Sequence, residues 1–256
     1  MVDEATRFSA NLGFLWRDRS LPEAIRAAPA QGFDAVECHW PYDEPVNAVR
    51  QALADTGLTM LGLNTRPGDT NGLCALPDRE EEAKASVDEA VRYAEEIGCP
   101  AIHVMAGRAE GPASREAFLR NLDYACRAYP EGTILIEPLN AHDAPGYFLR
   151  NTKQACAIVE EVGRPNLEIM FDCYHVARTE GAVLERLRAL RPLIGHVQFA
   201  GVPDRGPPDR GSLDYGEVFA LLRELNWERP LGAEYRPNGP TEASLGWLRT
   251  IRRGTD

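Results

Sequence analysis

Four short apolar segments of this 256-residue sequence each end in a side chain that carries oxygen ligands. Thr-Ile-Leu-Ile leads to Glu137, Leu-Glu-Ile-Met-Phe to Asp172, Ile-Gly-His-Val to Gln198, and Leu-Gly-Ala to Glu234. An acid at the end of a buried strand is costly unless it is paired or bound to a metal. Crowded acids also raise one another's pKa values unless a cation compensates. Because oxygen ligands suit Mg²⁺ or Mn²⁺ better than structural Zn²⁺, we predict a site for one divalent metal ion.

Each of these acids has an alternative role, either in a buried ion pair with an arginine or as a cap at the start of a helix. For one isolated Glu or Asp, that structural role is favoured. Four such residues on consecutive predicted strands favour a functional site, because the strand ends of an α/β barrel form one catalytic face.

Histidines lie close to two of these positions. His175 follows Asp172 by three residues, where it could bind a substrate oxygen; its alternative role is to cap the next helix. His196 precedes Gln198 by two residues and faces the same side of its strand, so we expect it lower in the barrel. The remaining histidines, His39, His103 and His142, are expected to be polar filling.

Three arginines follow predicted strand ends and could hold a substrate carboxylate through paired hydrogen bonds. Arg205, in the loop after Gln198, is the first candidate, and Arg108 and Arg236 are the others. The alternative for each is a solvated ion pair, because arginine is mostly exposed in folded proteins.

The elements that must position these residues alternate between short apolar runs and amphipathic helical stretches. The predicted strands lie near Phe8–Phe14, Ala35–His39, Thr59–Leu63, Ala101–Met105, Thr133–Glu137, Leu167–Asp172, Gly195–Phe199 and Leu231–Tyr235. This pattern predicts a single (β/α)8 barrel domain over residues 1–256. A doubly wound open sheet is the alternative, but no G-x-G-x-x-G follows the first strand.

Composition limits the classes of partner. The net charge of −11 disfavours a nucleic-acid binder, which needs a basic surface, and leaves a small-molecule substrate. No apolar run reaches 18 residues, so no membrane association is expected. Residues 1–10 have no apolar core typical of a signal peptide, so we expect a cytoplasmic protein whose six cysteines are reduced.

Motifs along nearly the whole chain resemble those of the hydroxypyruvate isomerase family within the xylose-isomerase-like barrels. The resemblance is carried by Arg7-Phe8-Ser9-Ala10-Asn11-Leu12, Glu37, Pro41-Tyr42-Asp43, Ile136-Glu137-Pro138-Leu139-Asn140, Pro145-Gly146-Tyr147, Asp172-Cys173-Tyr174-His175, Gly195-His196-Val197-Gln198, Arg205-Gly206 and Glu234-Tyr235-Arg236-Pro237. Together these stretches are specific, although each alone is weak.

The resemblance implies that Glu137, Asp172, Gln198 and Glu234 bind the metal and that Glu137 and Glu234 form the acid/base pair. It implies an exchange of hydroxypyruvate with tartronate semialdehyde through an enediolate. Members of the wider family isomerise a 2-oxo-tetronate or epimerise ketoses at the same kind of site. The loop of residues 64–72 is shorter than is usual in the family, and such loops set substrate choice.

Two other classes remain open from the sequence. An endonuclease IV-type phosphodiesterase needs more histidines for a three-zinc cluster, and Gln198 stands where it needs one. A barrel without catalysis that binds a sugar acid or a protein is disfavoured by the complete Glu–Asp–Gln–Glu set. The resemblance also allows a homo-oligomer in which barrels pair.

Overall fold

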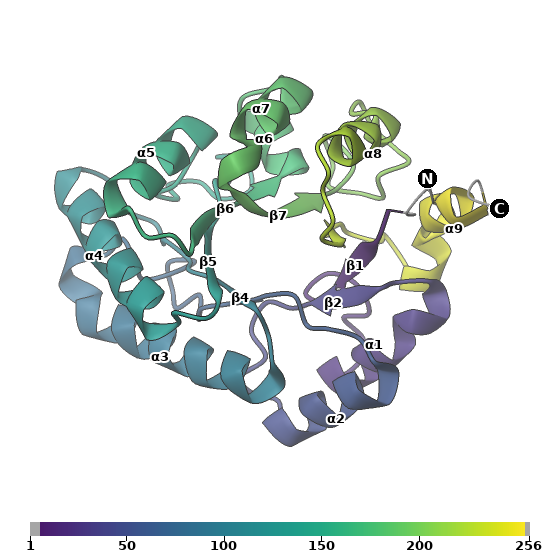
Figure 1. Cartoon of the computed structure of the whole chain (residues 1–256), viewed down its shortest axis with the longest axis horizontal. Coiled ribbons are helices and arrows are strands. Elements are labelled where there is room, and N and C mark those ends of the chain that lie inside the picture. The colour runs from purple at the N-terminus through teal and green to yellow at the C-terminus, as the bar shows by residue number, and fades with distance from the viewer. Residues whose placement is uncertain (1–5, 254–256) are drawn as a thin grey trace.

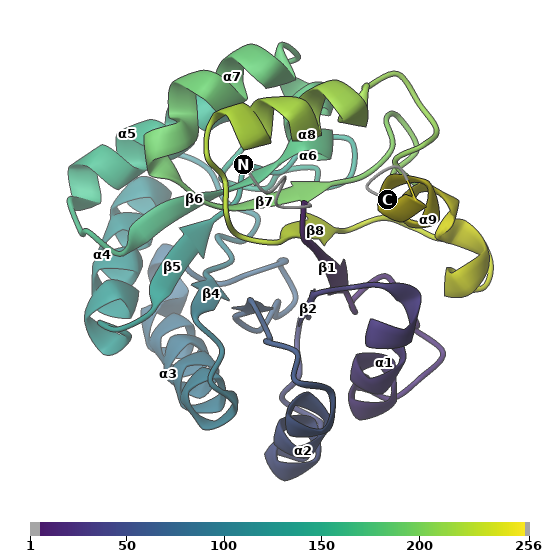
Figure 2. The same cartoon turned by 45° about the vertical axis from the view of Figure 1, so that its right-hand side comes forward.

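The computed structural model describes residues 6–253, which form a parallel barrel of strands enclosed by helices (Figures 1 and 2). The strands in this range are β1 (Phe8–Asn11), β2 (Ala35–Glu37), β3 (Leu63–Asn64), β4 (Ala101–His103), β5 (Thr133–Ile136), β6 (Leu167–Asp172), β7 (Ile194–Phe199) and β8 (Leu231–Ala233). They are hydrogen-bonded in the order β2-β1-β8-β7-β6-β5-β4-β3. A parallel bridge between Val36 and Met60 closes the seam between the two ends of the sheet. The predicted (β/α)8 barrel is confirmed.

Helices surround the strands on the outside of the barrel, as Figure 1 shows. The α-helices are α1 (Leu21–Ala27), α2 (Val46–Thr56), α3 (Glu80–Ile97), α4 (Pro112–Ala128), α5 (Thr152–Val162), α6 (Cys173–Thr179), α7 (Val183–Leu190), α8 (Tyr215–Glu224) and α9 (Gly246–Arg253). Short 3₁₀ turns lie at Pro29–Gln31, Pro77–Arg79, Arg191–Leu193 and Thr241–Ser244. Within residues 6–253, no helix is both long and apolar enough to cross a membrane.

Two predicted strands have different bounds in the structure. β1 ends at Asn11 rather than near Phe14, because the Asn11 carbonyl accepts hydrogen bonds from the backbone N–H groups of Phe14 and Leu15 and turns the chain. The third strand, predicted over Thr59–Leu63, is regular only at Leu63–Asn64. Residues 59–62 still form backbone hydrogen bonds with residues 36–38. Within this stretch, Met60 forms a parallel bridge with Val36.

Side chains two residues apart on a strand point to the same side, and in this barrel polar side chains lie above a cluster of apolar ones. Ala101, Leu135 and Met170 form a buried apolar group of their own on β4, β5 and β6. Two residues further along the same strands come His103, Glu137 and Asp172, which therefore point to the same interior side. The barrel thus collects polar groups at the carboxyl ends of its strands, above a packed floor.

Large aromatic side chains fasten the last helices to the barrel. The rings of Phe8 on β1 and Phe199 on β7 pack edge-on against each other and against Phe219 of α8 and Trp247 of α9, at centroid distances of 5.1–5.9 Å. Edge-to-face pairs of this kind add about 0.5–1.5 kcal/mol each beyond the burial of their area.

The six cysteines are all free, as expected. We expected no signal peptide in residues 1–10, but residues 1–5 lie outside the described range.

The loop after β3 is fastened to the end of β4 at a position that only glycine fits. Cys74 N–H donates to the Met105 carbonyl, and Ala75 N–H donates to the Ala106 carbonyl. Gly72 pairs with Ala106 at a φ of 121°, and a Cβ on Gly72 would lie 2.5 Å from the Met105 carbonyl oxygen.

We therefore expect Gly72→Ala to lower the free energy of unfolding by more than about 2 kcal/mol, because backbone strain and a backbone clash act together. The matched control is Gly57→Ala, at a φ of 69° with no atom within 4 Å of the added Cβ, which should cost only about 1 kcal/mol. Urea denaturation of both variants measures the difference. Equal losses in the two variants would show that the close approach to Met105 is unimportant.

Candidate active site

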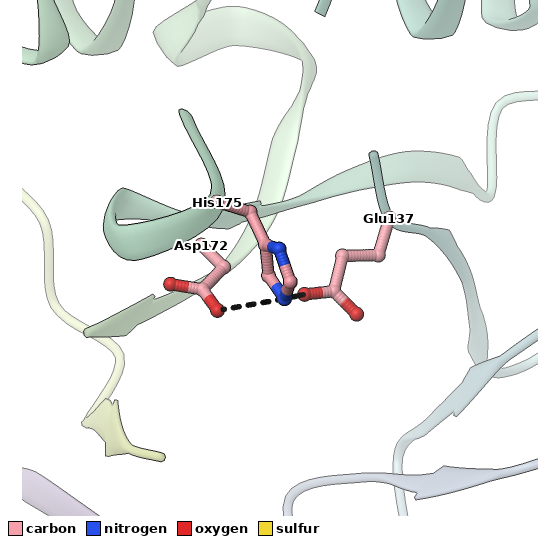
Figure 3. A group of neighbouring side chains, drawn as sticks. All are labelled: Glu137, Asp172 and His175. Carbon is pink, nitrogen blue, oxygen red and sulfur yellow. Dashed lines mark ion pairs between the residues drawn. The ribbon is translucent and has the colours of Figure 1, made fainter. Parts of the chain in front are cut away.

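A buried cluster lies where β5 and β6 end and α6 begins. One ligand atom from each of Glu137, Asp172 and His175 lies within 4.8 Å of the others. His175 Nε2 is 3.6 Å from Asp172 Oδ2 and 3.9 Å from Glu137 Oε1. Figure 3 shows the imidazole ring between the two carboxylates. The structure thus brings together three of the residues that the sequence singled out.

Several polar atoms of this cluster are buried without a hydrogen-bond partner among the described residues. They are Glu137 Oε1, Asp172 Oδ2, His175 Nε2 and Gln198 Oε1. Gln198 is the register partner of Asp172 on the neighbouring strand β7. A buried polar atom without a partner costs about 1–3 kcal/mol. Because these unpartnered atoms lie on adjacent strand ends, a bound ligand or ion is the simplest way to satisfy them.

The hydrogen bonds of His175 determine which of its nitrogen atoms carries the proton. Nδ1 is 3.0 Å from the backbone N–H of Asn140, which can only donate. The neutral ring therefore carries its proton on Nε2. Burial lowers the pKa of His175 to about 3, which keeps the ring neutral. In this state His175 offers an N–H donor to a ligand, and the oxygen atoms of Glu137 and Asp172 are the better candidates for a cation.

Glu234, at the end of β8, is held by a different set of partners. Its Oε1 accepts from Asn11 Nδ2 at 3.0 Å and lies 3.0 Å from His39 Nε2, and its Oε2 pairs with Arg205. Burial alone would raise the pKa of Glu234, but the Arg205 charge and the His39 hydrogen bond together lower it. These partners favour the anionic form of Glu234.

Arg205 enters the site from the loop after β7. Its guanidinium lies 4.7 Å from the ring centre of Phe14 and 5.2 Å from that of Tyr174, with Asp172 Oδ2 at 3.5 Å. The Nε–H group is buried and has no partner in the described part of the chain. Arg205 thus supplies positive charge between Glu234 and Asp172 and retains one unused donor.

The other two predicted arginines are not brought into the cluster. Arg108 is exposed and donates to the backbone carbonyl of Asp69 at 2.7 Å. Arg236 is exposed too, and its backbone N–H donates to the carbonyl of Arg205. Both lie on chain segments that border the site, whereas their guanidinium groups do not contact its carboxylates.

Burial and mutual repulsion shift the remaining acids. The pKa of Glu137 is raised by burial and by the charges of Glu234 and Asp172. Burial also raises the pKa of Asp172, against the opposing charge of Arg205. The expected crowding of acids is therefore present, and a single arginine compensates for it only in part.

Glu37 is a further buried acid that the ligand prediction did not include. It ends β2, is 3% exposed, and accepts hydrogen bonds from Asn11, Gln198 and His196. The same signal that marked the other acids, an apolar run ending in a carboxylate, also marks Ala-Val-Glu37.

Two histidines expected to be polar filling lie beside acids of the site. His39 Nε2 is 3.0 Å from Glu234 Oε1, and His103 Nδ1 is 3.8 Å from Glu137 Oε2. His196 lies one layer below Gln198, as expected, and His142 is exposed.

We expect Mn²⁺ to raise the melting temperature of the metal-depleted protein, because an ion bound only by the folded state adds about 2.7 kcal/mol at 100 times its Kd. Asp172→Asn should remove most of this gain. Glu168→Gln is the control, since Glu168 lies at the opposite end of β6, beside Arg229. Scanning fluorimetry with and without Mn²⁺ gives the shifts. A shift that persists in Asp172→Asn would place the ion elsewhere.

The sequence is similar to that of a known family of barrel proteins and to two isomerases. Residues 25–251 match the family described as xylose isomerase-like TIM barrel. The 2-oxo-tetronate isomerase of Cupriavidus necator is 42% identical over 95% of this chain and 97% of its own length. The hydroxypyruvate isomerase of Escherichia coli is 34% identical over 96% of this chain and 99% of its own.

A solved structure is similar to the same extent. The protein from Brucella melitensis described as AP endonuclease, family 2, superimposes with a TM-score of 0.92 and is 35% identical, covering 96% of this chain and 98% of that one. Similarity to these proteins therefore extends over nearly the full length of each chain.

Proposed function

The chain belongs to the hydroxypyruvate isomerase and 2-oxo-tetronate isomerase family of xylose isomerase-like barrels, and we propose that it interconverts hydroxypyruvate and tartronate semialdehyde at a site for one divalent metal ion. The relatives identify the chain as an isomerase of this type. The proposal rests on the buried oxygens of Glu137, Asp172 and Gln198 that have no hydrogen-bond partner in the described part of the chain.

The proposed metal ligands are Glu137, Asp172, Gln198 and Glu234. Their oxygen atoms fit a hard cation such as Mg²⁺ or Mn²⁺, and three of the four residues retain an unpartnered oxygen. A bound divalent ion supplies a Lewis acid that stabilises negative charge on substrate oxygen atoms. Glu234 already accepts hydrogen bonds on both oxygens, and its remaining lone pairs are available for a ligand.

Glu137 and Glu234 are the proposed acid/base pair. The reaction removes a proton from the carbon that bears the hydroxyl group and returns a proton to the neighbouring carbon, through an enediolate. The two glutamates end β5 and β8, which are separated in the sheet by β6 and β7, so they reach a substrate from different sides of the barrel. This arrangement suits proton transfer at two adjacent carbon atoms.

His175 and Arg205 are proposed to hold the substrate. The unpartnered Nε2–H of His175 can donate to a carbonyl oxygen, and the guanidinium of Arg205 can bind a carboxylate. Arg108 and Arg236 are proposed as weaker contributors to carboxylate binding, since both are exposed at the border of the site.

Glu137→Gln and Glu234→Gln should each lower kcat at least about 100-fold, because each removes a group that transfers a proton. Both variants should also lose the exchange of the substrate proton with D2O, measured by NMR. Glu131→Gln, an exposed change before β5, is the matched control and should retain wild-type turnover. Exchange at the wild-type rate in both variants would assign the proton transfer to other residues.

Removal of the metal gives an independent test. EDTA should abolish turnover, and Mg²⁺ or Mn²⁺ should restore it, since the proposed charge stabilisation requires the ion. Full turnover by protein shown to be metal-free by elemental analysis would contradict the proposed metal dependence.

Arg205→Lys should raise KM for a carboxylate substrate about tenfold or more, because lysine keeps the charge and loses the two parallel hydrogen bonds. Arg210→Lys, an exposed change in the same loop, is the control. Lysine at Arg108 or Arg236 should raise KM less. Steady-state kinetics would contradict this ranking if Arg205→Lys behaved as the control does.

Relatives named 2-oxo-tetronate isomerase and hydroxypyruvate isomerase are both similar to this chain, so the choice of substrate is tested directly. A panel of hydroxypyruvate, 2-oxo-tetronates and free ketoses, each with Mg²⁺ and Mn²⁺, separates the proposed activity from 2-oxo-tetronate isomerisation and ketose 3-epimerisation. Preference is measured as kcat/KM.

The name of the Brucella melitensis protein raises an endonuclease as a second candidate. Against it, Gln198 is a poor ligand for a zinc cluster, and the net charge of −11 repels phosphates. Incision of a duplex that contains an abasic site would support the endonuclease. The absence of both incision and isomerisation would favour a barrel that only binds a sugar acid.

A further inference from the structure

Glu37 is a buried acid for which the proposed reaction has no role. It ends β2 with 3% of its surface exposed. Its Oε1 accepts from Gln198 Nε2 at 2.8 Å and from Asn11 Nδ2 at 3.1 Å, and its Oε2 lies 2.7 Å from His196 Nε2. A carboxyl group this deeply buried is tolerated because three side chains form hydrogen bonds with it.

The contact between Glu37 and Gln198 fixes which way the amide faces. Gln198 Nε2 donates to Glu37 Oε1 at 2.8 Å, so the amide presents its NH₂ group to Glu37. The opposite orientation would place two oxygen atoms 2.8 Å apart. The carbonyl oxygen of Gln198 therefore faces away from Glu37, where it is buried and has no partner among residues 6–253.

We propose that Glu37 is a positioning residue that orients the Gln198 amide so that its carbonyl oxygen is available to the metal. The inference rests on the proposed function, because it assumes an ion beside Gln198. A free amide can present either its oxygen or its nitrogen, and only the oxygen binds a cation. Groups that orient a ligand in this way typically change metal affinity by about 10- to 100-fold when they are mutated.

The surrounding side chains hold Glu37 in place from two directions. Asn11 donates to Glu37 and Glu234 with the same Nδ2 group, and its side-chain oxygen Oδ1 accepts from the Gly13 backbone N–H at 2.9 Å. From β7, His196 contacts the other oxygen of Glu37.

The opposite side of the contact depends on a glycine. A Cβ on Gly232 would lie 2.6 Å from Glu37 Oε1 and 2.8 Å from Gln198 Cγ. Gly232 is the register partner of Gln198 on β8, so the missing side chain leaves the space in which Glu37 and Gln198 meet. The contact is thus built from four strands.

The test measures the Kd of Mn²⁺ for the metal-depleted protein by isothermal titration calorimetry. Wild type is compared with Glu37→Gln, Gln198→Ala and the double variant. Glu37→Gln should raise the Kd about 10- to 100-fold, since glutamine can donate to the amide oxygen and allow it to turn. In the Gln198→Ala background, the same change should alter the Kd less than about threefold, because no amide remains to be oriented.

Glu37→Asp tests whether the position of the carboxyl group, rather than its presence alone, orients the Gln198 amide. It also replaces Glu37→Gln as the test if that variant does not fold. Aspartate keeps the negative charge but is one methylene shorter, so it should weaken Mn²⁺ binding as well. Wild-type affinity in a folded Glu37→Asp, or equal effects of Glu37→Gln in both backgrounds, would overturn the positioning role. A wild-type protein that binds no Mn²⁺ would overturn the proposed metal site together with this inference, whereas tight wild-type binding with an unchanged Glu37→Gln would overturn the inference alone.

Discussion

Acidic side chains buried at one end of the barrel impose the constraint on which the rest of the site depends. A charge removed from water must be compensated nearby, or its group changes its protonation state. Here Glu37 forms hydrogen bonds with Asn11, Gln198 and His196, and Glu234 is paired with Arg205 together with His39 and Asn11. Glu137 Oε1 and Asp172 Oδ2 are buried and have no hydrogen-bond partner among residues 6–253, and burial raises the pKa values of both acids. The site is therefore short of positive charge, which is the condition that favours a cation.

The barrel makes this crowding tolerable because its elements are stiff and its floor is apolar. Ala101, Leu135 and Met170 form a buried apolar cluster two residues before His103, Glu137 and Asp172 on the same strands. Each acid is attached to the end of a hydrogen-bonded strand, which restricts how far it can retreat from its neighbours. Repulsion is then relieved by what binds between the acids, and this links the stability of the fold to its chemistry.

The sequence predicted the acids better than it predicted their partners. An apolar run that ends in a carboxylate identified Glu137, Asp172 and Glu234, and the same rule applied to β2 would have identified Glu37. His39 and Arg205 were harder to place, because both lie in loops whose path depends on packing. Among the arginines that follow strand ends, only Arg205 reaches the carboxylates, whereas Arg108 and Arg236 are exposed.

The sequence by itself determined the barrel and the strand ends that carry ligands, since hydrophobic periodicity and residue order are local properties of the chain. It also carried the motifs of the family. Only the tertiary structure decided that Glu234 pairs with Arg205, that His175 presents an N–H donor, and that Glu37 faces the Gln198 amide. These contacts join residues 29 to 161 positions apart, and no local pattern specifies which side chains meet across the barrel interior.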